Sequence, residues 1–294
     1  MATAQQSVPN PPWPSHCPLR LGLVVDQSDS MAAKFGEVRE AASNVVDALR
    51  DKRSEISIIG FGTDAEVIRS DVDTSDDDAR HQLKDQIDGL SAHDGDDSAT
   101  NWEAALLAAK EFRLDVAVLV TDGFPNVYGS PPTQGEDQAI AAATAAANQL
   151  KQNGTRLTGV GIELDETGAR NLESITGPGR GDDYFVTDTA GLLRQLYKIV
   201  ASSCGVPLAA LPQPEPPDFP WTEVVLGALG ALALIGAVAY GPHRRRGAAT
   251  TAPAPAGAGG AIAKDGRIDH SDLTRRLRGI RPDEQNTDAT KDRP

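Results

Sequence analysis

The chain has 294 residues, with 28 Lys and Arg against 42 Asp and Glu and a formal net charge of -14. This balance argues against a nucleic-acid partner, because phosphate backbones attract basic surfaces. The charge is uneven: residues 1–240 hold 17 basic and 35 acidic residues, whereas residues 241–294 hold 11 and 7, which predicts an acidic part and a basic tail with different surroundings.

Residues 1–18 form an N-terminal extension rich in proline and polar residues. They lack the basic and apolar regions of a signal peptide, although residues 2–4 (ATA) fit an A-x-A cleavage site. A domain that faces outward from the cell, as the C-terminal part predicts below, needs an export signal. We therefore expect that signal to be encoded upstream of this sequence.

Residues 19–204 alternate apolar, β-branched runs with segments of helical periodicity. The pattern predicts strands over 19–25, 56–61, 116–120, 156–162 and 184–186, and helices over 34–50, 81–90, 101–112, 136–150, 167–175 and 190–202. A turn at 62–64 leads into an apolar segment at 65–68, which favours a hairpin. The fold class is therefore α/β, with a doubly wound, mostly parallel sheet and one antiparallel edge strand.

The two cysteines stand at the ends of this domain. Cys17 precedes the first predicted strand, and Cys204 closes the last predicted helix. A disulfide between them would join the two ends of the domain and would need an oxidising compartment. The alternative is two unrelated buried thiols.

The C-terminal part has the composition of a membrane anchor. Residues 205–220 predict a proline-rich, extended stalk, and residues 221–242 contain an apolar, uncharged run over 224–240 that predicts a transmembrane helix. The alternative is a buried helix of a soluble protein. Three arginines at 244–246 begin a basic tail, 243–294, which we expect to be disordered and cytoplasmic, so that residues 1–220 face outward from the cell membrane.

Oxygen-bearing side chains follow several predicted strands. The loop after the first predicted strand reads D-x-S-x-S at residues 26–30. Thr100 stands directly before the helix predicted over 101–112, and the strand predicted over 116–120 is followed by T-D-G. Ligands of open parallel sheets bind at the carboxyl ends of the strands, and hard cations such as Mg²⁺, Ca²⁺ or Mn²⁺ prefer oxygen. The candidate ligands are Asp26, Ser28, Ser30, Thr100 and Asp122. Taken alone, the D-x-S-x-S loop has an alternative interpretation as a helix cap and turn.

Residues 19–204 resemble a von Willebrand factor A (vWA) domain. The resemblance rests on D-x-S-x-S at Asp26, T-N-x-x-x-A-L at Thr100 and T-D-G at Asp122, in the order found in that family. It implies a metal-ion-dependent adhesion site in which Ser28, Ser30 and Thr100 are ligands and the two aspartates hold the ion directly or through water. It further implies Mg²⁺ as the usual ion and a protein partner that supplies a carboxylate.

Two features depart from the family pattern or add charge to it. Asp29 stands where the family usually has glycine, and it either points to solvent or adds negative charge near the cation. The acidic run at 93–97, which contains Asp96 and Asp97, is either a solvated loop or a second, weaker Ca²⁺ site.

These features predict a membrane-anchored surface module that binds a protein or wall ligand through a divalent cation. The alternative is an envelope scaffold that assembles a membrane protein complex through the same domain. We do not expect an enzyme, because the sequence has no G-x-S-x-G and no P-loop. A haloacid-dehalogenase-like phosphatase would need a second aspartate where Ser28 stands.

Overall fold

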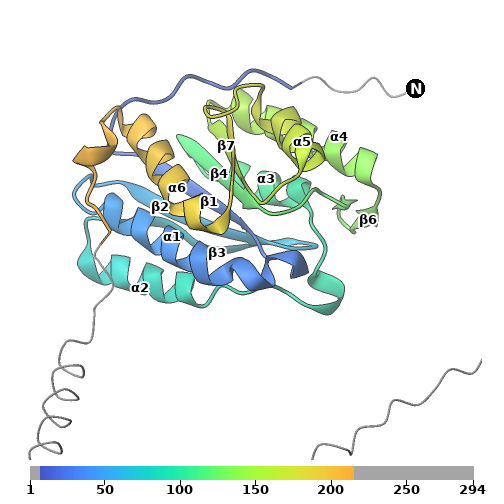
Figure 1. Cartoon of the computed structure of the whole chain (residues 1–294), viewed down its shortest axis with the longest axis horizontal. Helices are drawn as coiled ribbons and strands as arrows, with labels where there is room; N and C mark the ends of the chain where they lie inside the picture. The colour runs from blue at the N-terminus through green and yellow to red at the C-terminus, as the bar shows by residue number, and fades with distance from the viewer. Residues whose placement is uncertain (1–6, 215–294) are drawn as a thin grey trace, which may run out of the picture. The chain divides into compact units, whose positions relative to one another are not determined.

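A computed structural model of the chain describes residues 7–214, and Figure 1 shows their arrangement. The main sheet contains, in spatial order, β3 (Ala65–Asp73), β2 (Glu55–Phe61), β1 (Arg20–Asp26), β4 (Val116–Thr121), β7 (Arg156–Ile162) and β8 (Tyr184–Thr187). Strand β3 pairs antiparallel with β2, and all other neighbouring strands are parallel. The predicted mostly parallel sheet with an antiparallel edge strand is therefore confirmed.

Helices cover both faces of the sheet (Figure 1). One layer consists of α1 (Phe35–Ala48), α2 (Asp77–Asp88) and α6 (Thr189–Cys204), and the other of α3 (Trp102–Lys110), α4 (Glu136–Gln152) and α5 (Glu166–Thr176). Strand β1 serves both layers, because Leu23 and Val25 pack with the first and Val24 packs with the second. Alternating side chains of a strand point to opposite faces, so a central strand that is apolar throughout must be buried on both.

The structure differs from the sequence prediction at the sheet edge and in one loop. Strand β3 runs to Asp73 rather than ending at 68, and most of its residues are at least partly exposed. The second half of this strand is mostly polar and was therefore not recognised from the sequence, because an edge strand carries an apolar pattern only where other elements cover it. A small second sheet, β5 (Val127–Tyr128) with β6 (Thr133–Gln134), was not predicted because two-residue strands carry no periodic pattern.

The membrane prediction concerns residues that the structure does not describe. Within residues 7–214, no helix is long and apolar enough to cross a lipid bilayer. The predicted transmembrane segment at 221–242 and the tail at 243–294 lie outside the described residues, as does the last part of the predicted stalk.

The predicted disulfide is present. Cys17 and Cys204 are bonded to each other, with their Cα atoms 4.8 Å apart. The backbone amide of His16 also donates a hydrogen bond to the carbonyl of Ser203, 3.0 Å away. Because Cys17 lies just before β1 and Cys204 is the last residue of α6, the bond lies at the amino ends of the parallel strands.

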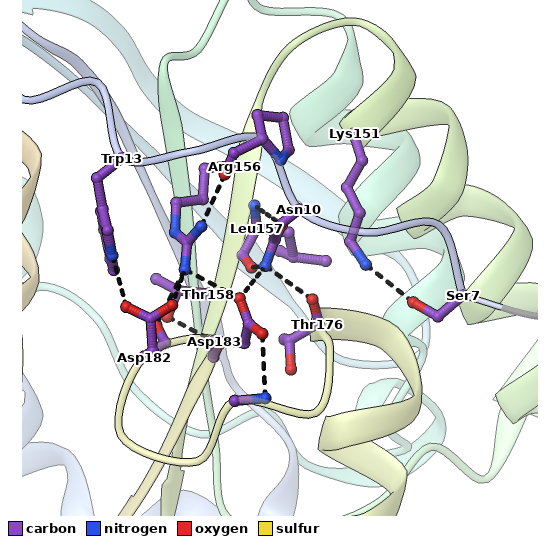
Figure 2. Close-up of polar contacts among 12 residues, drawn as sticks. Ser7, Asn10, Trp13, Lys151, Arg156, Leu157, Thr158, Thr176, Asp182 and Asp183 are labelled. Atoms are coloured by element: carbon purple, nitrogen blue, oxygen red, sulfur yellow. Dashed lines mark hydrogen bonds and ion pairs between the residues drawn. The ribbon is translucent and has the colours of Figure 1, made fainter.

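The N-terminal extension is bound to the domain at this same edge (Figure 2). The Asn10 amide nitrogen lies 2.8 Å from the Leu157 carbonyl, 2.7 Å from the Thr176 carbonyl and 2.8 Å from Asp183 Oδ1. The side-chain oxygen of Asn10, Oδ1, accepts a hydrogen bond of 3.0 Å from the backbone amide of Leu157. One asparagine thereby satisfies backbone groups of both β7 and α5.

Arg156 holds the next part of the extension. Its guanidinium lies 4.1 Å from the centroid of the Trp13 ring and donates to the Pro11 carbonyl at 2.7 Å (Figure 2). It also contacts Asp182 Oδ2 at 2.8 Å and Asp183 Oδ1 at 2.9 Å. Arg156 is 4% exposed, so these contacts neutralise a buried charge. We call residues 7–14 the N-terminal strap.

Replacing Asn10 by alanine is expected to lower the free energy of unfolding by about 1–3 kcal/mol, because the Leu157 amide and the carbonyls around it lose their partner. Urea denaturation of both proteins measures the change. Asn153→Ala is the matched control, because Asn153 is exposed at the end of α4, and it should stay within about 0.5 kcal/mol. Equal stabilities of Asn10→Ala and the control would show that the strap is not held by Asn10.

Candidate metal site

Asp26 is the last residue of β1, and its carboxylate is fully buried at the carboxyl edge of the sheet. Its Oδ1 accepts a hydrogen bond of 2.8 Å from the Ser28 amide, and its Oδ2 accepts one of 2.6 Å from the Thr121 hydroxyl. Burial raises the pKa of Asp26 to about 6, although hydrogen bonds from Ser28 and Thr121 oppose this shift. Among residues 7–214, no Lys, Arg or His side chain forms an ion pair with this carboxylate.

Ser28, Ser30 and Asp122 continue from Asp26 as one hydrogen-bonded set. The Ser28 and Ser30 hydroxyl oxygens lie 3.2 Å apart, and the Ser30 hydroxyl donates to Asp122 Oδ1 at 2.6 Å. Strands β1 and β4 are parallel neighbours, and their ends therefore bring Asp26 and Asp122 to the same edge. The structure thus unites four of the five predicted ligands.

Thr100 lies on the adjoining loop, just before α3. Its amide donates to Asn126 Oδ1 and its carbonyl accepts from the Asn126 amide, both at 3.0 Å. The Asp29 amide donates to the Ser98 carbonyl at 3.3 Å, which fastens this loop to the loop after β1. In the described part of the chain, no hydrogen bond joins the buried Thr100 hydroxyl to the other four side chains. Among the described residues, Thr100 is thus the predicted ligand that hydrogen bonds do not join to this set.

Two residues at the site were missed by the sequence analysis. Thr121 positions Asp26 through its hydroxyl, and the Lys34 ammonium lies 2.6 Å from Asp122 Oδ2. Thr121 belongs to the T-D-G motif, in which only Asp122 is predicted as a ligand. The sequence pattern predicts a helix that begins at Lys34, whereas the structure has a 3-10 helix over Asp29–Lys34 that ends there. Lys34 stands four residues after Ser30, and this spacing is the sequence signal for it, because residues about one helical turn apart lie on the same face.

The three predicted modulators lie on the segments after β1 and before α3. The side chains of Asp29, Asp96 and Asp97 are exposed, and Asp97 Oδ2 lies 2.8 Å from His93 Nδ1. The Thr63 hydroxyl donates to the backbone carbonyl of Asp96 at 2.7 Å. Among residues 7–214, no group of three or more His, Cys, Asp or Glu residues is placed to hold a metal ion. These contacts favour the solvated-loop interpretation of 93–97 over a second Ca²⁺ site.

The donor set nevertheless fits a hard divalent cation. It offers two carboxylates and neighbouring hydroxyls, all oxygen, and no imidazole or thiolate. Asp26 is buried with the Ser28 amide and the Thr121 hydroxyl as donors, and no basic side chain of residues 7–214 pairs with it, so a divalent ion would neutralise its charge. Such a site can hold an ion and still leave it open to a further oxygen ligand, because Ser30 is exposed.

The raised pKa of Asp26 predicts a pH dependence of stability in EDTA. The pKa in the folded protein, about 6, lies above the value of 3.8 for the unfolded chain, so the folded state binds more protons in between. Stability from this group is therefore present at low pH and is lost as pH rises to about 6. We expect a loss of about 3 kcal/mol across this range. Urea denaturation of the wild type and Asp26→Asn measures it; equal slopes in both would contradict it.

Comparisons with known proteins identify the family of the domain. A family model of the von Willebrand factor type A domain matches residues 21–199. The chain therefore belongs to the von Willebrand factor type A domain family. No curated protein matches the sequence.

Solved structures of this fold include two from bacterial pili. The vWF domain of the type V pili tip protein Mfa5 from Porphyromonas gingivalis matches with 13% identity and a TM-score of 0.53, over 69% of this chain and 99% of that one. The pilus adhesin SpaC from Lactobacillus rhamnosus GG matches with 16% identity and a TM-score of 0.52, over 65% of this chain and 31% of that one. At these identities the likeness concerns the fold.

Proposed function

We propose that the vWA domain binds a divalent cation, most simply Mg²⁺, at Asp26, Ser28, Ser30, Thr100 and Asp122, and that this ion captures a carboxylate of a protein ligand. The observation that carries the proposal is the hydrogen-bonded oxygen set at the carboxyl edge of the sheet. The domain is otherwise strongly acidic, so a bound cation would supply the local attraction for an acidic group.

Adhesion is the role that we propose for this binding. SpaC is named a pilus adhesin, and the Mfa5 domain belongs to a pilus tip protein. The extension to this chain rests on its oxygen-lined site, because the identities are low. We assign the domain a binding role rather than a catalytic one.

An outward-facing location supports the same role. The disulfide between Cys17 and Cys204 suits an oxidising compartment. We propose that residues 221–242 anchor the chain by a single membrane span and that the tail at 243–294 is cytoplasmic. The disulfide supports the location of the domain, whereas the anchor rests on the sequence pattern alone.

The test is a binding screen with the immobilised full chain against a peptide array in which each acidic peptide is paired with its amide counterpart. We expect binding to acidic peptides in Mg²⁺ that is lost in EDTA and in Asp26→Ala. Asp85→Ala, which alters an exposed residue of α2, is the control and should bind as the wild type does. Binding that survives both EDTA and Asp26→Ala would contradict the proposal.

A further inference from the structure

Lys34 forms an ion pair with Asp122, one of the carboxylates that would bind the proposed cation. Its ammonium lies 2.6 Å from Asp122 Oδ2 and 3.4 Å from the Ser30 carbonyl. Asp122 Oδ1 is engaged by the Ser30 hydroxyl at 2.6 Å. The Asp122 side chain is 1% exposed and that of Lys34 17% exposed, so water screens this pair only weakly. Both oxygens of the carboxylate are thus satisfied, and its charge is neutralised by the protein itself.

We propose that Lys34 is a built-in competitor of the divalent cation at Asp122, and that displacement of its ammonium sets the affinity of the site for the ion. This inference rests on the proposed function. A divalent ion held by Ser30 and Asp122 would lie within a few ångströms of the ammonium, where like charges repel strongly in a half-buried setting. The ion must therefore break a short, charge-assisted hydrogen bond before it binds.

Glu163 offers the displaced ammonium a second partner. Glu163 Oε2 lies 3.8 Å from Lys34 Nζ, and its side chain is 57% exposed. Glu163 directly follows β7, the neighbour of β4, and its amide donates to the Thr187 carbonyl at 2.7 Å. Its φ of 57° is a left-handed value that residues other than glycine seldom adopt. The ammonium can therefore pass from Asp122 to Glu163 without leaving the site edge.

The competition makes opposite predictions for the removal of the Lys34 charge and for the removal of the Glu163 charge. Lys34→Met removes the competitor and should tighten Mg²⁺ binding by about 10- to 100-fold, the worth of one hydrogen bond to a charged group. Lys34→Arg keeps the charge and should stay near the wild type. Glu163→Gln removes the second partner of the ammonium and should weaken binding. Calorimetric titration of each full chain with Mg²⁺ measures these affinities.

A second readout needs no metal. In EDTA, Lys34→Met leaves Asp122 buried without a cation, so its thermal unfolding should begin at a lower temperature than that of the wild type. Saturating Mg²⁺ should remove this difference. Lys52→Met is the matched control: it makes the same change of net charge at a surface pair with Asp51 and should alter neither readout.

Tighter binding by Lys34→Met, with Lys52→Met unchanged, supports the inference. Equal or weaker binding by Lys34→Met overturns it, and so does an absence of binding in both the wild type and Lys34→Met. Binding by Lys34→Met alone would sustain the inference while contradicting the proposed function. Conversely, a wild type that binds Mg²⁺ without capturing any acidic peptide contradicts the proposed function only.

Discussion

Replacing both Cys17 and Cys204 by alanine is expected to lower the free energy of unfolding by about 5 kcal/mol. The disulfide joins residues 187 positions apart, and the chain-entropy model assigns this value to closing so long a loop in the unfolded chain. Such a loss is a large share of the stability of an ordinary domain. Urea denaturation of the full chain, with and without the substitutions, measures it.

Reducing agent provides the control for this experiment. It should lower the stability of the wild type to that of the double variant and should leave the double variant unchanged. A change below about 1 kcal/mol in the double variant would mean that the strap and the contact of His16 with Ser203 already hold the domain ends together. In that case the bond would add little to folding.

Asp122→Asn is expected to weaken Mg²⁺ binding by more than about 100-fold. Asparagine preserves the size of the side chain but removes the charge that attracts the ion. Removing a residue that only orients a metal ligand typically weakens metal binding by about 10- to 100-fold. Removing a charged ligand itself should weaken it more. Calorimetric titration measures the affinity, with Asp85→Asn, an exposed aspartate of α2, as the control of equal charge change.

The fold of Asp122→Asn must be intact for this comparison. The same far-ultraviolet circular dichroism as the wild type would establish that. A folded Asp122→Asn with wild-type affinity would contradict the assignment of Asp122 to the site. A loss of affinity in Asp85→Asn as well would attribute the effect to net charge.

Much of the fold follows from local patterns that sequence reasoning can detect. The segment Leu157–Ile162 lies within an apolar strand that is buried throughout, and such runs bounded by helices predict a parallel sheet. The second half of β3 could not be predicted, because it is mostly exposed and polar. The strap could not be predicted either, since Asn10 contacts Leu157 and Thr176, far away in sequence.

The candidate site shows the same limit. Asp26, Ser30 and Asp122 were predicted because each stands in a short motif at a strand end, and the sheet brings strand ends together. The Thr121 hydroxyl contacts Asp26 and the Lys34 ammonium contacts Asp122 across different elements, and the motifs do not show these contacts. A pattern identifies which residues can be ligands, whereas packing determines which charges already neutralise them.

The divalent-cation site is tested most directly by titrating the full chain with Mn²⁺ and following it by electron paramagnetic resonance. Mn²⁺ accepts the same oxygen ligands as Mg²⁺, and its free form has a distinct signal. We expect one Mn²⁺ to bind per chain and excess Mg²⁺ to release it. A signal from Mn²⁺ that stays entirely free at millimolar concentration would contradict the presence of a divalent-cation site in this domain.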